Sequence, residues 1–183
     1  MSPDYLPRRL LCCAYFLTGV IQVGKTTIIR SFLKQSGLSA DGFLTHWDSS
    51  YVGGRALYLS PYAPNIHKVV RYCLAQCHGE RFVKEENIEV IFDVHGTGIL
   101  SSAGKLDIII MDELGFLESK AYAFQDAVLG HIAGAVPILG VIKPKRTRFL
   151  GEIRTRPEVR VCEVTEENRN WVLEWLLTVF KPC

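Results

Sequence analysis

The sequence predicts an α/β fold in three layers: a mostly parallel central sheet, which includes an antiparallel hairpin, covered by helices on both faces. Two observations predict it. Continuously apolar runs of strand length recur along the chain and alternate with segments of helical periodicity. The first of these runs also passes directly into a glycine-containing turn followed by a helix. In such a sheet, a ligand binds beyond the carboxyl ends of the strands.

Length and composition predict one globular domain over residues 1–183, with 48% hydrophobic residues to form a core. The net charge of +2 is too small to indicate a nucleic-acid binder. No apolar run reaches the roughly 18 residues of a membrane span. Arg8 and Arg9 before an apolar run imitate a secretion signal, but no cleavage site follows them. We therefore expect a cytoplasmic protein without a membrane or specific nucleic-acid partner.

The first apolar run, Leu10–Thr18, is predicted to be a buried strand, and Thr26 begins a helix that continues to about Gln35. Ser36 and Gly37 end that helix. Asp41–Trp47 then alternates like a short strand. A turn at Gly53 and Gly54 leads to Arg55–Ser60, its predicted hairpin partner.

The turn after the first strand fits the pattern G-x-x-x-x-G-K-[ST], the phosphate-binding loop of nucleotide-binding proteins. Its glycines allow the backbone to approach phosphates, and the following helix adds unpaired N–H groups and the positive end of its dipole. Lys25 is expected to reach the outer phosphates, and the Thr26 hydroxyl to hold Mg²⁺. A positive φ at Gln22 would cost about 1 kcal/mol or more. The predicted nucleotide-binding segment is Gly19, Val20, Ile21, Gln22, Val23, Gly24, Lys25, Thr26 and Thr27.

The remaining elements follow the same alternation. Between residues 65 and 77 the pattern is ambiguous, with a strand favoured for Val69–Leu74. Lys84–Asp93 is predicted to be helical and to be interrupted at His95–Gly98. Ser119 is a candidate cap for a helix that reaches Ile132. The later predicted elements are a short helix through Ala103, strands at Leu106–Met111, Pro137–Ile142 and Val159–Val164, a short helix at Phe149–Arg154, and a final helix opened by Thr165–Asn168.

The strand at Leu106–Met111 ends in two carboxylates, Asp112 and Glu113. A nucleotide hydrolase needs a carboxylate at such a strand end, within reach of Mg²⁺, and this is the expected role of Asp112. The next carboxylate, Glu113, is positioned to orient or deprotonate the attacking water. Lys143 leaves the following strand directly and is the favoured residue of a basic loop to stabilise phosphate oxygens. A solvated acidic strand end and a solvated basic loop are the alternatives.

The cysteines and histidines do not predict a metal or catalytic site. Cys12 and Cys13 are expected in the first buried strand and Cys162 in a later one, as small hydrophobic residues. Cys73, Cys77 and His78 lack a second pair at ligand spacing, so free thiols are the favoured interpretation. His46 and His95 are expected to have structural or surface roles, because no nucleophile pairs with them.

These motifs together resemble the thermophile-type nucleoside-triphosphatase family, a group of P-loop proteins related to nucleotide kinases. The resemblance covers most of the chain. The residues that carry it are Phe16–Gly19, Val23–Thr27, Gly42–Thr45, Arg55, Met111–Glu118, Phe149–Ile153 and Thr165–Arg169. There are two departures: Ile21-Gln22 stands where the family usually has Pro-Gly, and Phe116-Leu117 where it typically has Lys-Met, which removes a positive charge beside the site.

The resemblance implies a P-loop NTPase fold and slow, Mg²⁺-dependent hydrolysis of ATP, GTP and other nucleoside triphosphates to diphosphate and phosphate. It also implies that Asp112 and Glu113 carry the magnesium and water roles. Together with the phosphate-loop pattern, this makes Lys25 and Glu113 the predicted catalytic residues and Thr26 and Asp112 the predicted metal ligands. It places Asn168 near the base or at the sheet edge, and Asn168 is taken as a nucleotide-binding residue. Two alternatives stay open: a small-molecule or nucleotide kinase with an acceptor pocket at the Asp41–Ser60 hairpin, and a nucleotide-dependent switch that acts through an unidentified protein partner.

Overall fold

The computed structural model describes residues 14–51, 53–63, 69–103 and 106–180 of the chain. Its centre is an eight-stranded sheet in the order β5-β4-β3-β2-β6-β7-β1-β8. The strands β2, β6, β7, β1 and β8 pair in parallel. The strands β2, β3, β4 and β5 form an antiparallel meander. The strands are β1 (Ala14–Thr18), β2 (Ala40–Asp48), β3 (Arg55–Pro61), β4 (Tyr72–His78), β5 (Arg81–Lys84), β6 (Ile108–Leu114), β7 (Ile138–Ile142) and β8 (Val159–Glu163).

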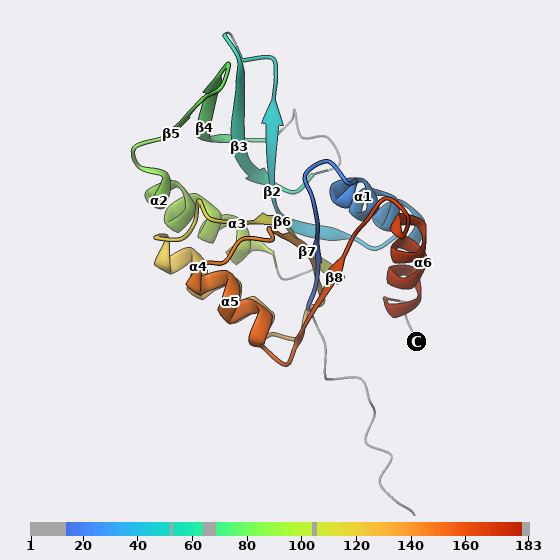
Figure 1. Cartoon of the computed structure of the whole chain (residues 1–183). Helices are drawn as coiled ribbons and strands as arrows, with labels where there is room; N and C mark the ends of the chain where they lie inside the picture. Colours follow the sequence, from blue (N-terminus) through green and yellow to red (C-terminus); the bar gives the residue numbers. More distant parts are fainter. Residues whose placement is uncertain (1–13, 52, 64–68, 104–105, 181–183) are drawn as a thin grey trace, which may run out of the picture.

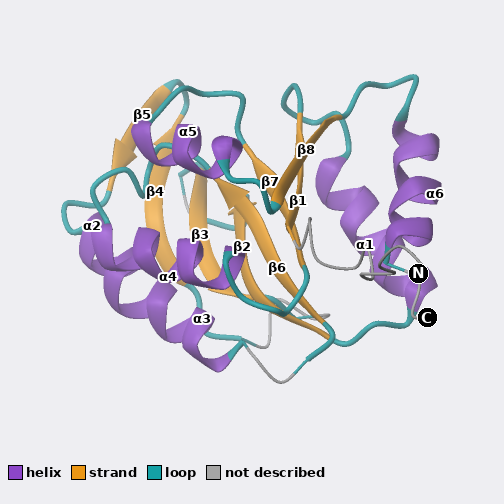
Figure 2. Cartoon of the chain, turned by 90° about the horizontal axis from the view of Figure 1, so that it is seen from below, coloured by secondary structure: helices purple, strands orange, loops and turns teal. Residues whose placement is uncertain are grey.

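Helices cover both faces of the sheet. Figure 1 shows α1 and α6 on one side of the strands and α2, α3, α4 and α5 on the other, and the rotated view in Figure 2 gives the same division. No helix in the described ranges is long and apolar enough to cross a membrane. The helical elements are α1 (Lys25–Ser36), α2 (Ile88–Val90), a π-helical turn η2 (Ile91–Gly96), α3 (Thr97–Ser102), α4 (Tyr122–Ile132), α5 (Arg148–Thr155) and α6 (Arg169–Val179).

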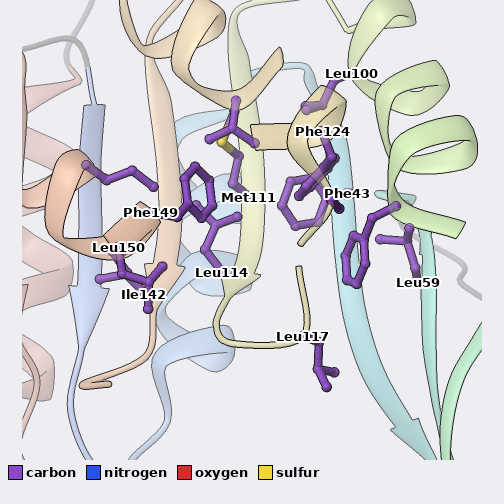
Figure 3. Close-up of a cluster of buried hydrophobic side chains, with 14 of the residues drawn as sticks. Phe43, Leu59, Leu100, Met111, Leu114, Leu117, Phe124, Ile142, Phe149 and Leu150 are labelled. Carbon is purple, nitrogen blue, oxygen red and sulfur yellow. The ribbon is translucent and has the colours of Figure 1, made fainter. Parts of the chain in front are cut away.

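The alternation of side chains along β6 divides the core into two clusters. Ile108 and Ile110 pack in the cluster that includes residues of α1 and α6, and Ile109 and Met111 pack in the cluster on the opposite face. Figure 3 shows Met111 in the latter cluster, among side chains from α3, α4 and α5. By this period of two, the next residue, Asp112, is directed toward α1. Asp112 therefore shares a face of the sheet with Ile108 and Ile110, and the packing of α1 and α6 decides what covers that face.

The predicted fold class is confirmed: the sheet is mostly parallel and lies between two helical layers. The phosphate loop joins β1 to α1, and Gly37 ends α1 in the left-handed conformation with φ 69°. The predicted hairpin is present as β2 and β3. It is part of a larger antiparallel region, because β4 and β5 continue the meander. The predicted first strand is described only from Ala14, so its residues 10–13, with Cys12 and Cys13, lie outside the described residues.

The prediction for residues 84–98 was wrong in two ways. Residues 81–84 form strand β5, and the helix begins only at Ile88. The segment His95–Gly98 does not interrupt it, because α2, η2 and α3 follow one another without a break. Gly96 has a packing role instead: a Cβ atom there would lie 2.7 Å from the Phe124 ring. The glycine permits close approach between two helices, which sequence reasoning mistook for a helix break.

Three smaller predictions also differ from the structure. Ser119 does not cap α4, which begins at Tyr122; instead Asp93, from the neighbouring η2, accepts a hydrogen bond of 2.9 Å from the Phe124 N–H. Cys162 is partly exposed rather than buried because β8 is an edge strand. The strand expected at Val69–Leu74 is β4, displaced toward the C-terminus, at Tyr72–His78.

Candidate functional site

The phosphate loop occupies the turn between β1 and α1. Gly19 has φ 133°, and a Cβ atom there would lie 2.5 Å from the Val164 carbonyl oxygen, so only glycine fits beside β8. Gly24, with φ 100°, is the residue before α1. Gln22 is the one non-glycine residue with positive φ among the described residues, at 66°. The condition stated for this position, a positive φ at Gln22, is therefore met, and the backbone there is strained.

Lys25 begins α1 and its side chain folds back over the loop. Its Nζ atom donates hydrogen bonds to the carbonyl oxygens of Gly19, at 3.0 Å, and Val20, at 2.7 Å. Burial lowers the pKa of this ammonium group, while the charges of Glu113 and Asp112 act in the opposite direction. The ammonium group is thus held by two backbone carbonyl oxygens of the loop, and the carboxylates of Glu113 and Asp112 are close enough to act on its pKa.

Asp112 is 3% exposed and faces α1, as the alternation along β6 requires. Burial raises the pKa of its carboxyl group to about 7, although a hydrogen bond from the Thr26 side chain opposes this shift. Its Oδ2 atom is buried and has no hydrogen-bond partner among the described residues. A buried carboxylate oxygen without a partner costs free energy unless a cation or donor satisfies it. This orphaned oxygen, next to the Thr26 hydroxyl, fits a metal site.

Glu113 is directed into the pocket rather than toward α1. Its Oε1 atom forms an ion pair of 2.7 Å with Nζ of Lys143, which leaves the end of β7. Its backbone N–H donates to the Thr45 hydroxyl at 3.2 Å. The two adjacent carboxylates therefore have different environments: Asp112 is enclosed by protein, and the side chain of Glu113 is 27% exposed and paired with a lysine.

A cavity of about 820 Å³ connects the phosphate loop with Glu113 and Lys143. It extends from the phosphate loop across the carboxyl ends of β7 and β6 to Trp47, near the end of β2. Its lining consists of Gly19, Val20, Ile21, Gln22, Gly24, Lys25, Thr26, Thr27, Trp47, Glu113, Phe116, Val141, Lys143, Pro144 and Lys145. A second cavity of about 750 Å³ lies away from it, between β4, β5 and the start of α2.

Most sequence-predicted site residues line the larger cavity, and three do not. Val23 is buried in the core cluster beneath the loop, and Asp112 lies below the cavity floor beside Thr26. Asn168 is engaged in the turn before α6: its Oδ1 accepts from the Thr165 N–H at 2.8 Å, and its Nδ2 donates to the Glu163 carbonyl at 2.9 Å. Nucleotide contact by Asn168 stays a prediction, and the observed hydrogen bonds are those of a helix-opening turn.

Sequence reasoning did not assign Trp47, Pro144 or Phe116 to the site. Trp47 is on the predicted hairpin, but its place beside the phosphate loop depends on β2 pairing with β6, which a sequence pattern does not specify. Phe116 was noticed only as a departure from the family pattern. An exposed tryptophan at the carboxyl end of a strand was the one available signal.

Comparisons with known proteins identify the family of this chain. The family model described as NTPase matches residues 14–177. The chain is 33% identical to the cancer-related nucleoside-triphosphatase homolog of Bos taurus, over 89% of this chain and 94% of that protein. It is 33% identical to the human cancer-related nucleoside-triphosphatase over the same shares. With nucleoside-triphosphatase THEP1 of Thermotoga sp. (strain RQ2), the identity is 28% over 90% of this chain and 94% of the relative.

Two solved structures have the same fold. THEP1 from Aquifex aeolicus superposes with a TM-score of 0.67 at 21% identity, covering 92% of this chain and 99% of the other. The solution structure of a human cancer-related nucleoside triphosphatase gives a TM-score of 0.66 at 29% identity, covering 90% and 95%. Because the family model spans nearly the whole described chain, this protein belongs to the NTPase family.

Proposed function

We propose that this protein hydrolyses nucleoside triphosphates, ATP, GTP and others, to nucleoside diphosphate and phosphate in a Mg²⁺-dependent reaction. The observation that carries the proposal is that one cavity contains the phosphate loop, the Lys25 ammonium group and the Glu113 carboxylate. These groups come from segments almost ninety residues apart in the sequence. Family membership and the names of the relatives support the same reaction.

The phosphate loop would bind the β- and γ-phosphates through its backbone N–H groups and the N-terminus of α1. Lys25 would exchange its hydrogen bonds to the Gly19 and Val20 carbonyls for bonds to phosphate oxygens. Its positive charge would then stabilise the charge that develops as the bond to the γ-phosphate breaks. The loop residues that do not face the cavity, such as Val23, anchor the turn in the core.

Thr26 and Asp112 are the residues that would hold Mg²⁺. Their side chains are hydrogen-bonded, and the Oδ2 atom of Asp112 has no partner among the described residues. Mg²⁺ typically uses one or two carboxylates together with phosphate oxygens and water, so a site without a larger cluster of ligands is sufficient. The described residues contain no cluster of three or more metal-ligating side chains. When bound, the ion would neutralise charge on the β- and γ-phosphate oxygens.

Glu113 is the residue that would orient and deprotonate the attacking water. Its carboxylate faces the cavity and is held by Lys143 at 2.7 Å. The ion pair fixes the position of the carboxylate, which can accept a proton from a water in the cavity. Lys143, which lines the same cavity, is also placed to contact a γ-phosphate oxygen. A cytoplasmic location, and the absence of a nucleic-acid partner, stay predictions from the sequence.

The test is steady-state phosphate release from ATP, GTP, CTP and UTP, with Mg²⁺ and with excess EDTA. We expect Glu113→Gln to lower kcat about a hundredfold, because general-base contributions are typically of that order. Glu166→Gln, which changes an exposed glutamate outside the cavity, is the matched control. Equal rates for wild type and Glu113→Gln would contradict the catalytic role of Glu113. Equal rates with Mg²⁺ and with EDTA would contradict the Mg²⁺ dependence of the reaction.

A further inference from the structure

The cavity continues past the position expected for the terminal phosphate. In phosphoryl transfer the attacking and leaving oxygens lie roughly in line, so the water-positioning residue and the nucleoside are on opposite sides of the γ-phosphate. Along the sheet edge, the cavity runs from the phosphate loop after β1, past Glu113 at the end of β6, to Trp47 on β2. The end formed by Trp47 and Phe116 is therefore on the side of attack, beyond Glu113 and away from the nucleoside.

Three lysines surround Phe116 at this end of the cavity: Lys143 and Lys145 line the cavity itself, and Lys84 lines the neighbouring second cavity. The Nζ atoms of Lys84, Lys143 and Lys145 lie 5.1, 5.5 and 5.3 Å from the centroid of the Phe116 ring. They come from the end of β5, the end of β7 and the loop after β7. We call them the lysine cluster. A fourth cation, Arg55, lies with its guanidinium carbon 4.5 Å from the Trp47 ring centroid.

The charge of the lysine cluster is not balanced. Across the described ranges, only Lys143 of the three forms an ion pair, with Glu113. Two of the three ammonium groups, those of Lys84 and Lys145, therefore have no carboxylate at ion-pair distance among the described residues. Contacts between a cation and an aromatic face reduce the electrostatic cost of placing these ammonium groups close together, but they do not cancel the repulsion between like charges. A bound anion would neutralise that repulsion.

We infer that the lysine cluster, with Phe116 and Trp47, forms a second subsite that binds a phosphate monoester with an apolar or planar body. A phosphate monoester carries nearly two negative charges at neutral pH, which matches the two unpaired ammonium groups, and lysine is a common phosphate ligand. The aromatic side chains at the same end of the cavity would contact the organic part of the ligand. The inference rests on the proposed function, because it assigns the phosphate loop to a nucleoside triphosphate.

The subsite extends the range of substrates open to this chain. A ligand held by the lysine cluster would lie on the side of the γ-phosphate from which water attacks. Trp47 and Arg55 belong to β2 and β3, so the hairpin that the sequence suggested as an acceptor pocket forms one wall of this end. Binding of a second phosphorylated molecule beside the triphosphate is the claim to test first, because any use of that molecule depends on it.

The test uses the full chain saturated with Mg²⁺ and a non-hydrolysable ATP analogue, so that the phosphate loop is filled. Phenyl phosphate, inorganic phosphate and phenol are then titrated separately by calorimetry. We expect phenyl phosphate to bind once per chain, at least tenfold more tightly than inorganic phosphate or phenol. Equal affinity for inorganic phosphate would overturn the assignment of an organic ligand. No binding of phenyl phosphate would overturn the subsite.

Lys84→Ala and Lys145→Ala identify the binding residues. Each should weaken phenyl phosphate binding at least fivefold, and Lys34→Ala, which removes an exposed lysine in the last turn of α1, should not. Lys84 does not line the cavity of the phosphate loop, so Lys84→Ala should retain the wild-type rate of ATP hydrolysis. Unchanged binding in both lysine variants would overturn the proposal. Failure of the ATP analogue itself to bind would instead contradict the proposed function, and the same calorimeter measures it first.

Discussion

One end of the cavity, residues 19–27, comes from a single continuous segment. The opposite end is assembled from three segments, which carry Trp47, Phe116 and the pair Lys143 and Lys145, and a fourth segment places Lys84 beside Phe116. The first end is specified by a short local motif with its own strand, turn and helix. The second depends on the pairing of β2 with β6 and on the length of the β4–β5 hairpin. The comparison indicates that binding of the triphosphate depends on residues contiguous in the sequence. Selectivity for a ligand beyond the γ-phosphate depends instead on residues that only folding brings together.

The two ends also treat charge differently. In the phosphate loop, the Lys25 ammonium group is satisfied by two backbone carbonyl oxygens of its own loop. At the opposite end, Lys84 and Lys145 contact an aromatic ring and form no ion pair within the part of the chain that the structure describes. Variants at each end should therefore separate loss of catalysis from loss of stability or of ligand choice.

The largest effect is expected from Lys25→Ala. Removing the ammonium group at the phosphate loop should lower kcat for ATP hydrolysis about a thousandfold, equivalent to about 4 kcal/mol of transition-state stabilisation. Phosphate release under saturating ATP measures it. Lys34→Ala, in the same helix, should keep the wild-type rate. A rate within threefold of wild type for Lys25→Ala would mean that the loop end does not perform the chemistry.

Glu118→Gln tests how a buried carboxyl group stabilises the turn next to Phe116, at the end of the cavity opposite the phosphate loop. Glu118 is fully buried, its carboxylate accepts a hydrogen bond from the Gly115 N–H, and burial raises the pKa of its carboxyl group to about 7. The unfolded chain releases this proton near the ordinary pKa, so the free energy of unfolding should fall as pH rises from about 4.5 to about 7 and then level off.

In Glu118→Gln, the contribution of this residue to the fall, on the order of 3 kcal/mol, should disappear. Denaturant unfolding at several pH values from 4.5 to 8 measures it. Part of the slope should remain, because Asp112 has a pKa raised to about 7 by the same cause. Identical slopes in variant and wild type would show that Glu118 does not keep its proton in the folded state.

Lys143→Ala should lower kcat about tenfold, because Glu113 loses the ion pair that orients it, while the KM for ATP changes less. Lys143→Arg can restore a cation near the Glu113 carboxylate and should recover most of the rate. Measuring kcat and KM for both variants separates positioning of Glu113 from simple attraction of the substrate. A rise in KM alone, with kcat unchanged, would assign Lys143 to ground-state binding.

The smallest effect is expected from Gln22→Gly. Glycine adopts the observed φ of 66° without strain, so the variant should gain up to about 1 kcal/mol in the free energy of unfolding, less the entropy that glycine adds to the unfolded chain. Thermal unfolding measures it. Ile21→Gly, at the neighbouring position without positive φ, should show no gain. Equal changes in the free energy of unfolding in both variants would show that strain at Gln22 is not the cause of the gain.

Much of the parallel part of the fold was predictable, since β1, β6 and β7 contain continuous apolar runs and Gly37 marks the end of α1. Of the antiparallel part, only the β2–β3 hairpin was predicted. Residues 81–83 of β5 were assigned to no element and Lys84 to a helix, because the four residues of β5 are exposed and carry no core pattern. The start of α4 was also missed, because Asp93, 31 positions earlier, supplies the hydrogen bond to its first turn. Interactions of this kind depend on which elements pack together and leave no local signal.

The sequence by itself determined the phosphate loop, the positions of the apolar strands along the chain and the presence of two carboxylates near the end of β6. Each of these features depends on residues that are neighbours along the chain. Only the tertiary structure decided that Asp112 faces α1 while Glu113 faces the cavity, and that three lysines surround Phe116. The physical reason is that strand order and the direction of each side chain are set by packing across the sheet. Charges that are distant in sequence acquire a common environment only when that packing is complete.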